Sequence, residues 1–90
     1  MPAEKHQNII GPLVLELREG KGWTQAELAR ELGTLGWKVS ESRVAKIESR
    51  KVAVKDFETL YLLTALGISQ QEFWRRLVAM NPEIPPSGAD

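Results

Sequence analysis

The strongest constraint on this chain is a pair of helix starts that lie close together, one at Thr24 and one at Ser40. Glu27 follows Thr24 by three positions. This spacing is typical of a capping box, in which each side chain accepts a hydrogen bond from the other residue's backbone amide. Ser40 is of the type that caps a helix through its hydroxyl oxygen. We therefore expect two short helices here, with the rest of the chain packed around them.

The two expected helices differ in the apolar surface that they carry. The first, residues 25–32, has an apolar stripe in which alanines allow another helix to pack closely. The second, residues 41–49, is anchored by Val44 and Ile47, three positions apart on one face. The residues left on its outer face are Glu41, Ser42, Arg43 and Lys46. A helix with few buried residues and a polar, basic outer face suits the major groove of DNA.

Three further helices are expected around this pair. Residues 11–19 have apolar residues at helical spacing and a proline in the first turn, where its missing N–H costs little. Residues 56–66 end before Gly67, and residues 70–80 follow a second capping box. The core stripe expected for residues 56–66 is Phe57, Leu60, Leu63 and Thr64. Since no stretch has the pattern of a strand, the predicted fold is all-α.

The chain of 90 residues is long enough for one small domain with a single core. We expect this domain at residues 9–80, between a flexible N-terminal tail at 1–8 and a flexible, proline-rich tail at 81–90. The chain has no cysteine, which fits a reducing cytoplasm. No apolar run is long enough to span a bilayer, so we predict a soluble protein without a membrane partner.

The formal net charge is zero, but its distribution is uneven. Residues 38–55 hold six basic and two acidic residues, a balance of +4, so the remainder carries −4. A net charge of zero argues against strong nonspecific binding to nucleic acid. The local excess of basic residues at 38–55 nevertheless favours contact with phosphates. A solvated basic face with no partner remains an alternative.

Several classes of enzyme are excluded by what the sequence lacks. The only histidine, His6, lies in the polar N-terminal stretch, and no serine or cysteine nucleophile is paired with it. There is no glycine loop of the phosphate-binding type and no cluster of metal ligands. We expect no catalysis, no cofactor and no metal.

Five short motifs occur in order along the chain: Leu17-Arg18, Gly22-Trp23-Thr24-Gln25, Glu27-Leu28-Ala29, Ile47-Glu48 and Leu66-Gly67-Ile68. Together they resemble the Cro/C1-type (XRE family) helix-turn-helix DNA-binding domain of bacterial and phage repressors, over residues 10–73. The resemblance implies a five-helix, lambda-repressor-like domain with residues 41–49 as recognition helix. It also implies a buried structural ion pair between Arg18 and Glu48, and a phosphate contact by Gln25.

Two features depart from the family. The turn at residues 33–39 is longer than the usual turn of about four residues and resembles that of a long-turn subgroup, which leaves the register of the recognition helix open. We expect Leu35, Trp37 and Val39 to be partly buried in it. Arg50 stands where many relatives have glycine after the helix. A left-handed backbone there would cost about 1–2 kcal/mol.

DNA contacts are assigned by the face on which each residue lies. Arg43 and Lys46 are expected to reach guanine in the major groove, while Ser40 and Ser42 bond bases or phosphates. Glu41 either reads a cytosine amino group or stabilises the helix dipole. The remaining expected contacts, mainly to phosphates, are Thr24, Gln25, Lys38, Arg50, Lys51 and Lys55.

The function that this interpretation favours is sequence-specific binding of double-stranded DNA by a cytoplasmic transcriptional repressor. One domain reads few base pairs, so a homodimer on two half-sites is expected. Its candidate surface on the helix at 70–80 is Phe73, Trp74 and Leu77, unless Trp74 and Leu77 close the core. Two alternatives remain open: a helix-turn-helix scaffold that binds a protein partner, and the antitoxin of a toxin-antitoxin pair.

Overall fold

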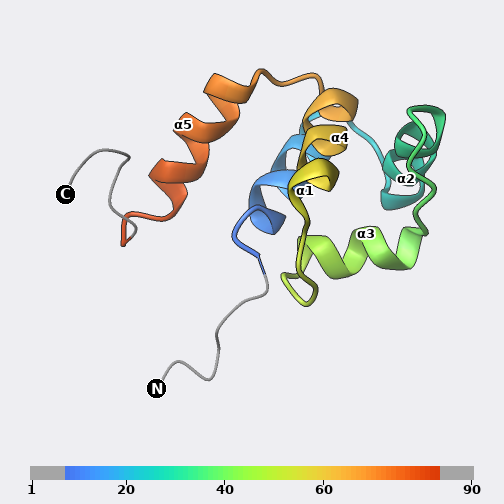
Figure 1. Ribbon diagram of the computed structural model, residues 1–90, viewed down its shortest axis with the longest axis horizontal. Helices are drawn as coiled ribbons and strands as arrows, with labels where there is room; N and C mark the ends of the chain where they lie inside the picture. The colour runs from blue at the N-terminus through green and yellow to red at the C-terminus, as the bar shows by residue number, and fades with distance from the viewer. Residues whose placement is uncertain (1–7, 84–90) are drawn as a thin grey trace.

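The computed structural model describes residues 8–83, which contain five helices joined by turns and loops (Figure 1). These residues contain no strand, so the predicted all-α fold is confirmed. The last two helices have the predicted bounds, while the other three differ from prediction by one or two residues at their ends. The bounds are α1 Gly11–Gly20, α2 Gln25–Thr34, α3 Glu41–Glu48, α4 Asp56–Leu66 and α5 Gln70–Met80.

The two helix starts identified in the sequence are capped as expected. The Thr24 hydroxyl oxygen accepts a hydrogen bond from the Glu27 amide at 3.1 Å, and the Thr24 amide donates to the Glu27 carboxylate at 2.7 Å. The Ser40 hydroxyl oxygen accepts from the Arg43 amide at 3.0 Å. At the start of α5 only half of the predicted box forms, because the carboxylate of Glu72 is paired with a neighbouring arginine.

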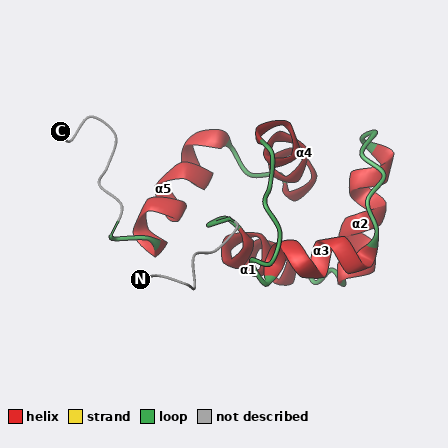
Figure 2. Cartoon of the chain, turned by 60° about the horizontal axis from the view of Figure 1, so that its bottom comes forward, coloured by secondary structure: helices red, strands yellow, loops and turns green. Residues whose placement is uncertain are grey.

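The core lies between α1, α2 and α4, with α3 beneath it and α5 closing one side (Figures 1 and 2). The prediction of which α4 residues enter the core is largely wrong. Leu63 is buried, but Phe57 is 49% exposed, Leu60 is 61% exposed and Thr64 is exposed. The residues of α4 that are buried lie on another face: Glu58, Leu62, Leu63 and Leu66. Since α4 carries apolar residues on nearly every side, its sequence is compatible with more than one stripe.

The long connection between α2 and α3 is packed onto α4. The Trp37 amide donates a hydrogen bond to the Leu32 carbonyl at 3.0 Å, and the Trp37 ring lies 5.9 Å from the Tyr61 ring, measured between centroids. Trp37 and Val39 are partly buried as expected. Leu35 is 40% exposed, contrary to expectation. The contact with α4 holds the start of α3 in place despite the length of the turn.

Two residues that the sequence analysis assigns to the tails, Asn8 and Asn81, are hydrogen-bonded to the domain. Asn8 is bound to the domain, since its side-chain amide donates to the Val52 carbonyl at 2.6 Å and its side-chain oxygen accepts from the Gly11 amide at 2.8 Å. Asn81 is buried, and its side-chain amide donates to the Leu77 carbonyl at 2.8 Å. Residues 1–7, with His6, and residues 84–90 lie outside the described residues, and so do the tail predictions that concern them. None of the described helices is long and apolar enough to cross a membrane.

Candidate nucleic-acid interface

α3 lies along one edge of the molecule, with its first turn beside α2 and its last turn beside α1 (Figures 1 and 2). Val44 and Ile47 are 1% exposed and attach this helix to the rest of the domain, as their spacing predicts. The opposite edge of α3 faces solvent. Its exposed residues are Glu41, Ser42, Lys46 and Ser49 at the helix end.

A buried ion pair fixes the end of α3 to α1. Arg18 Nε donates to Glu48 Oε2 at 2.6 Å, and Arg18 Nη2 donates to Glu48 Oε1 at 3.1 Å. The third donor, Arg18 Nη1, binds the Trp23 carbonyl at 2.6 Å, so the segment that enters α2 is tied to the same group. The hydrogen bond to the Glu48 carboxylate raises the pKa of Arg18 above its ordinary value. This is the pair that the resemblance implies.

Gln25 is also part of this buried network. Its side-chain amide donates to Glu48 Oε1 at 2.9 Å, which positions it between the first turn of α2 and the end of α3. The sequence did not predict this contact, because Gln25 and Glu48 lie 23 positions apart and no local pattern relates them. A side-chain amide has two N–H donors, so one remains for a phosphate.

Arg43 does not lie free on the outer edge of α3, in contrast to our expectation. Its Nη2 is 3.3 Å from Glu58 Oε1 and 3.4 Å from Glu58 Oε2, and it is 3.5 Å from the Ala53 carbonyl oxygen. Glu58 is only 6% exposed and also accepts a hydrogen bond from the Lys55 amide at 2.9 Å. The buried carboxylate therefore holds the arginine against the start of α4, because an unpaired buried charge is costly.

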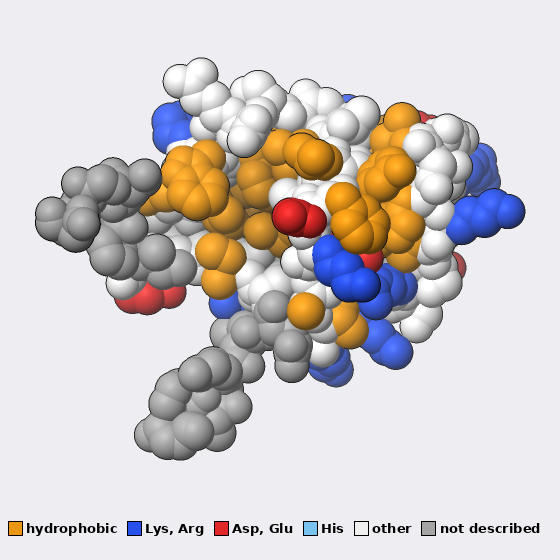
Figure 3. Space-filling view, in the orientation of Figure 1, with side chains coloured by type: hydrophobic (Ala, Val, Ile, Leu, Met, Phe, Trp, Pro, Cys, Tyr) orange, Lys and Arg blue, Asp and Glu red, His pale blue; other side chains and the backbone are white. Residues whose placement is uncertain are grey.

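Exposed lysines flank the outer edge of α3. Lys46 projects from the edge itself, as predicted. Lys38 precedes α3, and Lys51 and Lys55 follow it, and all three are exposed. In the space-filling view, basic side chains gather over the lower and right parts of the molecule (Figure 3). The hydroxyl groups of Thr24 and Ser40 lie near this edge, but both are already used as helix caps.

Arg50 follows α3 with a left-handed backbone, at φ 66°. Its Nε donates to the Asn8 carbonyl at 3.0 Å, so the side chain lies against the segment that precedes α1. Arg50 is half-buried there, which leaves only part of its guanidinium for the phosphate contact that we expected.

The predicted dimer surface on α5 is only partly exposed. Phe73 and Leu77 are each 4% exposed and belong to the core. The alternative that Trp74 and Leu77 close the core is therefore correct for Leu77 only. Trp74 is 56% exposed. Phe57 and Leu60 on α4 are exposed as well, although the sequence analysis places both of them in the core.

Comparison with known proteins gives one match. The family model described as a helix-turn-helix domain matches residues 11–74, which include all of α1 to α4 and the first turn of α5. The comparisons with curated proteins and with solved structures gave no match. Within residues 8–83, no group of three or more acidic or histidine side chains could hold a metal ion.

Proposed function

The chain belongs to the helix-turn-helix domain family, and from this premise we propose that it binds double-stranded DNA in a sequence-specific manner, with α3 in the major groove. The observation that carries the proposal is the exposed edge of α3, which is bordered by lysines from both adjoining loops. A rigidly attached helix whose outer side chains are polar suits base recognition, and flanking cations suit the two phosphate backbones.

The residues divide into those that read bases and those that bind the backbone. Lys46 is the cation best placed for a guanine edge, and Ser42 and Glu41 are exposed beside it in the first turn. Arg43 acts as a positioning residue through Glu58, which revises the base contact expected from the sequence. The phosphate contacts are Lys38, Lys51 and Lys55, with Gln25 at the start of α2.

The regulatory outcome that we propose is repression. A small domain bound across a promoter blocks access to it by occlusion. Two copies on two half-sites would give the necessary affinity. Binding to DNA would place the protein on the nucleoid, in the cytoplasm of a bacterium or a phage-infected cell.

The experiment is selection of duplex DNA from a random pool, followed by titration of the selected site and an unrelated duplex at two salt concentrations. Replacing Lys46 with alanine should weaken binding to the selected site far more than to the unrelated duplex. Replacing Lys51 should weaken both equally and lower the salt slope by about 0.9. Arg75 is exposed on α5 and paired with Glu72, and replacing it with alanine is the control. This substitution should change neither the affinity for the two duplexes nor the salt slope. Absence of binding at low salt would refute the proposal.

A second function is favoured by a separate observation. The exposed Phe57, Leu60 and Trp74 are apolar residues that a protein partner could cover. A scaffold that only binds protein would leave DNA unbound in the titration, whereas an antitoxin would bind both DNA and its toxin.

A further inference from the structure

The outer side of α4 and the neighbouring side of α5 form an apolar surface that nothing in the described chain covers. Its main residues are Phe57 and Leu60 on α4 and Trp74 on α5, with Leu35 at one margin. We call this surface the α4/α5 face. Orange side chains lie across the middle of the molecule, over these two helices, in Figure 3.

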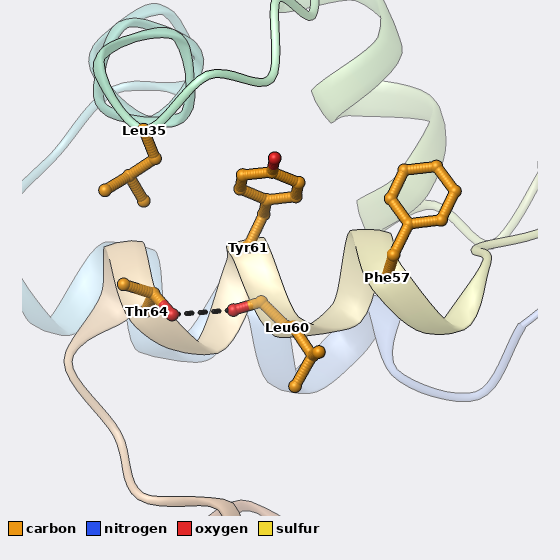
Figure 4. A pocket seen from close by; sticks show the side chains of 5 residues that line it. All are labelled: Leu35, Phe57, Leu60, Tyr61 and Thr64. Atoms are coloured by element: carbon orange, nitrogen blue, oxygen red, sulfur yellow. Dashed lines mark hydrogen bonds between the residues drawn. The ribbon is translucent and has the colours of Figure 1, made fainter.

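The α4/α5 face is hollowed on both sides of α4. One hollow lies between α4 and the end of α2, where Leu35 points toward α4 beside Tyr61, with Phe57 farther along the same helix (Figure 4). The Thr64 hydroxyl donates to the Leu60 carbonyl at 2.8 Å, so this polar group is already hydrogen-bonded within α4 (Figure 4). The second hollow is a groove between α4 and α5, with Phe73 and Leu63 in its floor and Trp74 on its far wall.

The exposed apolar side chains of this face supply more than half of the apolar area that one partner contributes to a stable protein interface. Phe57 and Trp74 are about half exposed and Leu60 slightly more, and with Leu35 they present on the order of 300 Å² of apolar surface. A standard interface buries about 800 Å² per partner, of which roughly 60% is apolar. Four side chains therefore supply more than half of the apolar area needed, and the polar residues Asp56, Thr59 and Gln70 line the margin of the groove, as expected for an interface rim.

We propose that the α4/α5 face is where a second copy of this chain docks, in a symmetric dimer centred on α4. The earlier expectation centred the dimer on α5, but Phe73 and Leu77 are in the core. In a symmetric interface the same patch serves both partners, so Leu60 and Trp74 of one copy would fill the groove of the other. No second binding surface is then needed on either copy.

The position of the face relative to α3 favours a second copy over another partner. The α4/α5 face looks toward the viewer in Figure 3, while α3 crosses the lower edge of the molecule in the same orientation (Figure 1). A twofold axis beside the face would thus leave both copies of α3 directed to the same side. DNA half-sites lie about 34–36 Å apart. The domain measures 40 × 30 × 23 Å and the face looks along its shortest axis, so a copy docked through this face is thinner than one half-site spacing. This step rests on the proposed DNA binding.

The test is sedimentation of the full chain without DNA, from low to high micromolar concentration. Leu60→Glu places a charge at the centre of the face and should raise the dimer dissociation constant by more than about tenfold. Ala79→Glu adds the same charge at an exposed position of α5 that does not line the groove, and it should leave the dissociation constant unchanged. Circular dichroism of both variants should show the same helix content as the parent.

Two results would overturn the proposal. The parent chain could remain monomeric at the highest concentration, which would leave the face to a different partner. Alternatively, Leu60→Glu could associate as tightly as Ala79→Glu, which would place the interface elsewhere. Because Lys46→Ala removes DNA recognition without touching the face, it should still dimerise. Dimers that bind no DNA would refute the proposed function and leave this interface standing.

Discussion

Replacing Glu48 with alanine is expected to be the most destabilising single change on the buried side of α3. Glu48 accepts three hydrogen bonds, two from Arg18 and one from Gln25, and Arg18 is only 8% exposed. Without the carboxylate, the guanidinium keeps only its bond to the Trp23 carbonyl and stays buried with its charge unpaired.

The expected cost can be compared with the stability of the whole domain. Removing one partner of a buried ion pair costs about 3–5 kcal/mol. A chain of 90 residues has a free energy of unfolding of roughly 5–13 kcal/mol. Glu48→Ala should therefore remove between about a quarter and nearly all of the stability. With an m-value near 1 kcal/mol per molar urea, the urea concentration at the midpoint of unfolding should fall by about 3 M or more.

Urea unfolding followed by circular dichroism measures this loss. Glu19→Ala is the matched control, because Glu19 is exposed next to Arg18, and it should change stability by less than about 0.5 kcal/mol. The double variant Arg18→Met, Glu48→Leu should recover most of the loss, since apolar residues of similar size leave no buried charge. A loss below about 1 kcal/mol for Glu48→Ala, or no recovery in the double variant, would refute the reasoning.

Three further predictions concern stability and are measured by the same unfolding assay. Arg50→Gly should be more stable than Arg50→Ala by about 0.5–1 kcal/mol. Both variants lose the arginine side chain, but only glycine adopts the left-handed backbone without strain. Equal stability of the two variants would show that the backbone at this position is not strained. Gly11→Ala should lower the free energy of unfolding by about 2 kcal/mol or more, since the new methyl group would overlap the Ile47 carbonyl oxygen. At Gly33, in α2, a new methyl group meets no atom, so Gly33→Ala should raise the free energy of unfolding by about 0.5–1 kcal/mol. Asn8→Ala should cost about 1–3 kcal/mol through its lost hydrogen bonds, and no loss would show that the N-terminal segment is not anchored.

The features that could be predicted from the sequence are those decided by neighbouring residues. Thr24 and Ser40 cap the helices that follow them because a cap depends only on the next three residues. Burial of Val44 and Ile47 follows from their spacing, and so does the exposure of Lys46 on the opposite edge. The resemblance to a family added the Arg18 to Glu48 pair, which no local pattern implies.

The features that could not be predicted depend on contacts between distant segments. Arg43 is drawn inward by Glu58, which lies 15 positions along the chain and whose burial is not visible in the sequence. Which face of α4 enters the core is decided by the packing of α1 and α2 against it, because its apolar residues surround the helix. For that reason Phe57 and Leu60 were assigned to the core and are found on the surface.

The way α3 is attached has a consequence for how this domain can diversify. Its anchoring residues point inward and its solvent-facing residues have no structural duty beyond helix formation, so the two sets can vary independently. On the function that we propose, exchanging Ser42 or Lys46 should alter the preferred target at almost no cost in folding. A lineage of such chains could therefore acquire new operators through a few surface substitutions, while the same scaffold is inherited unchanged.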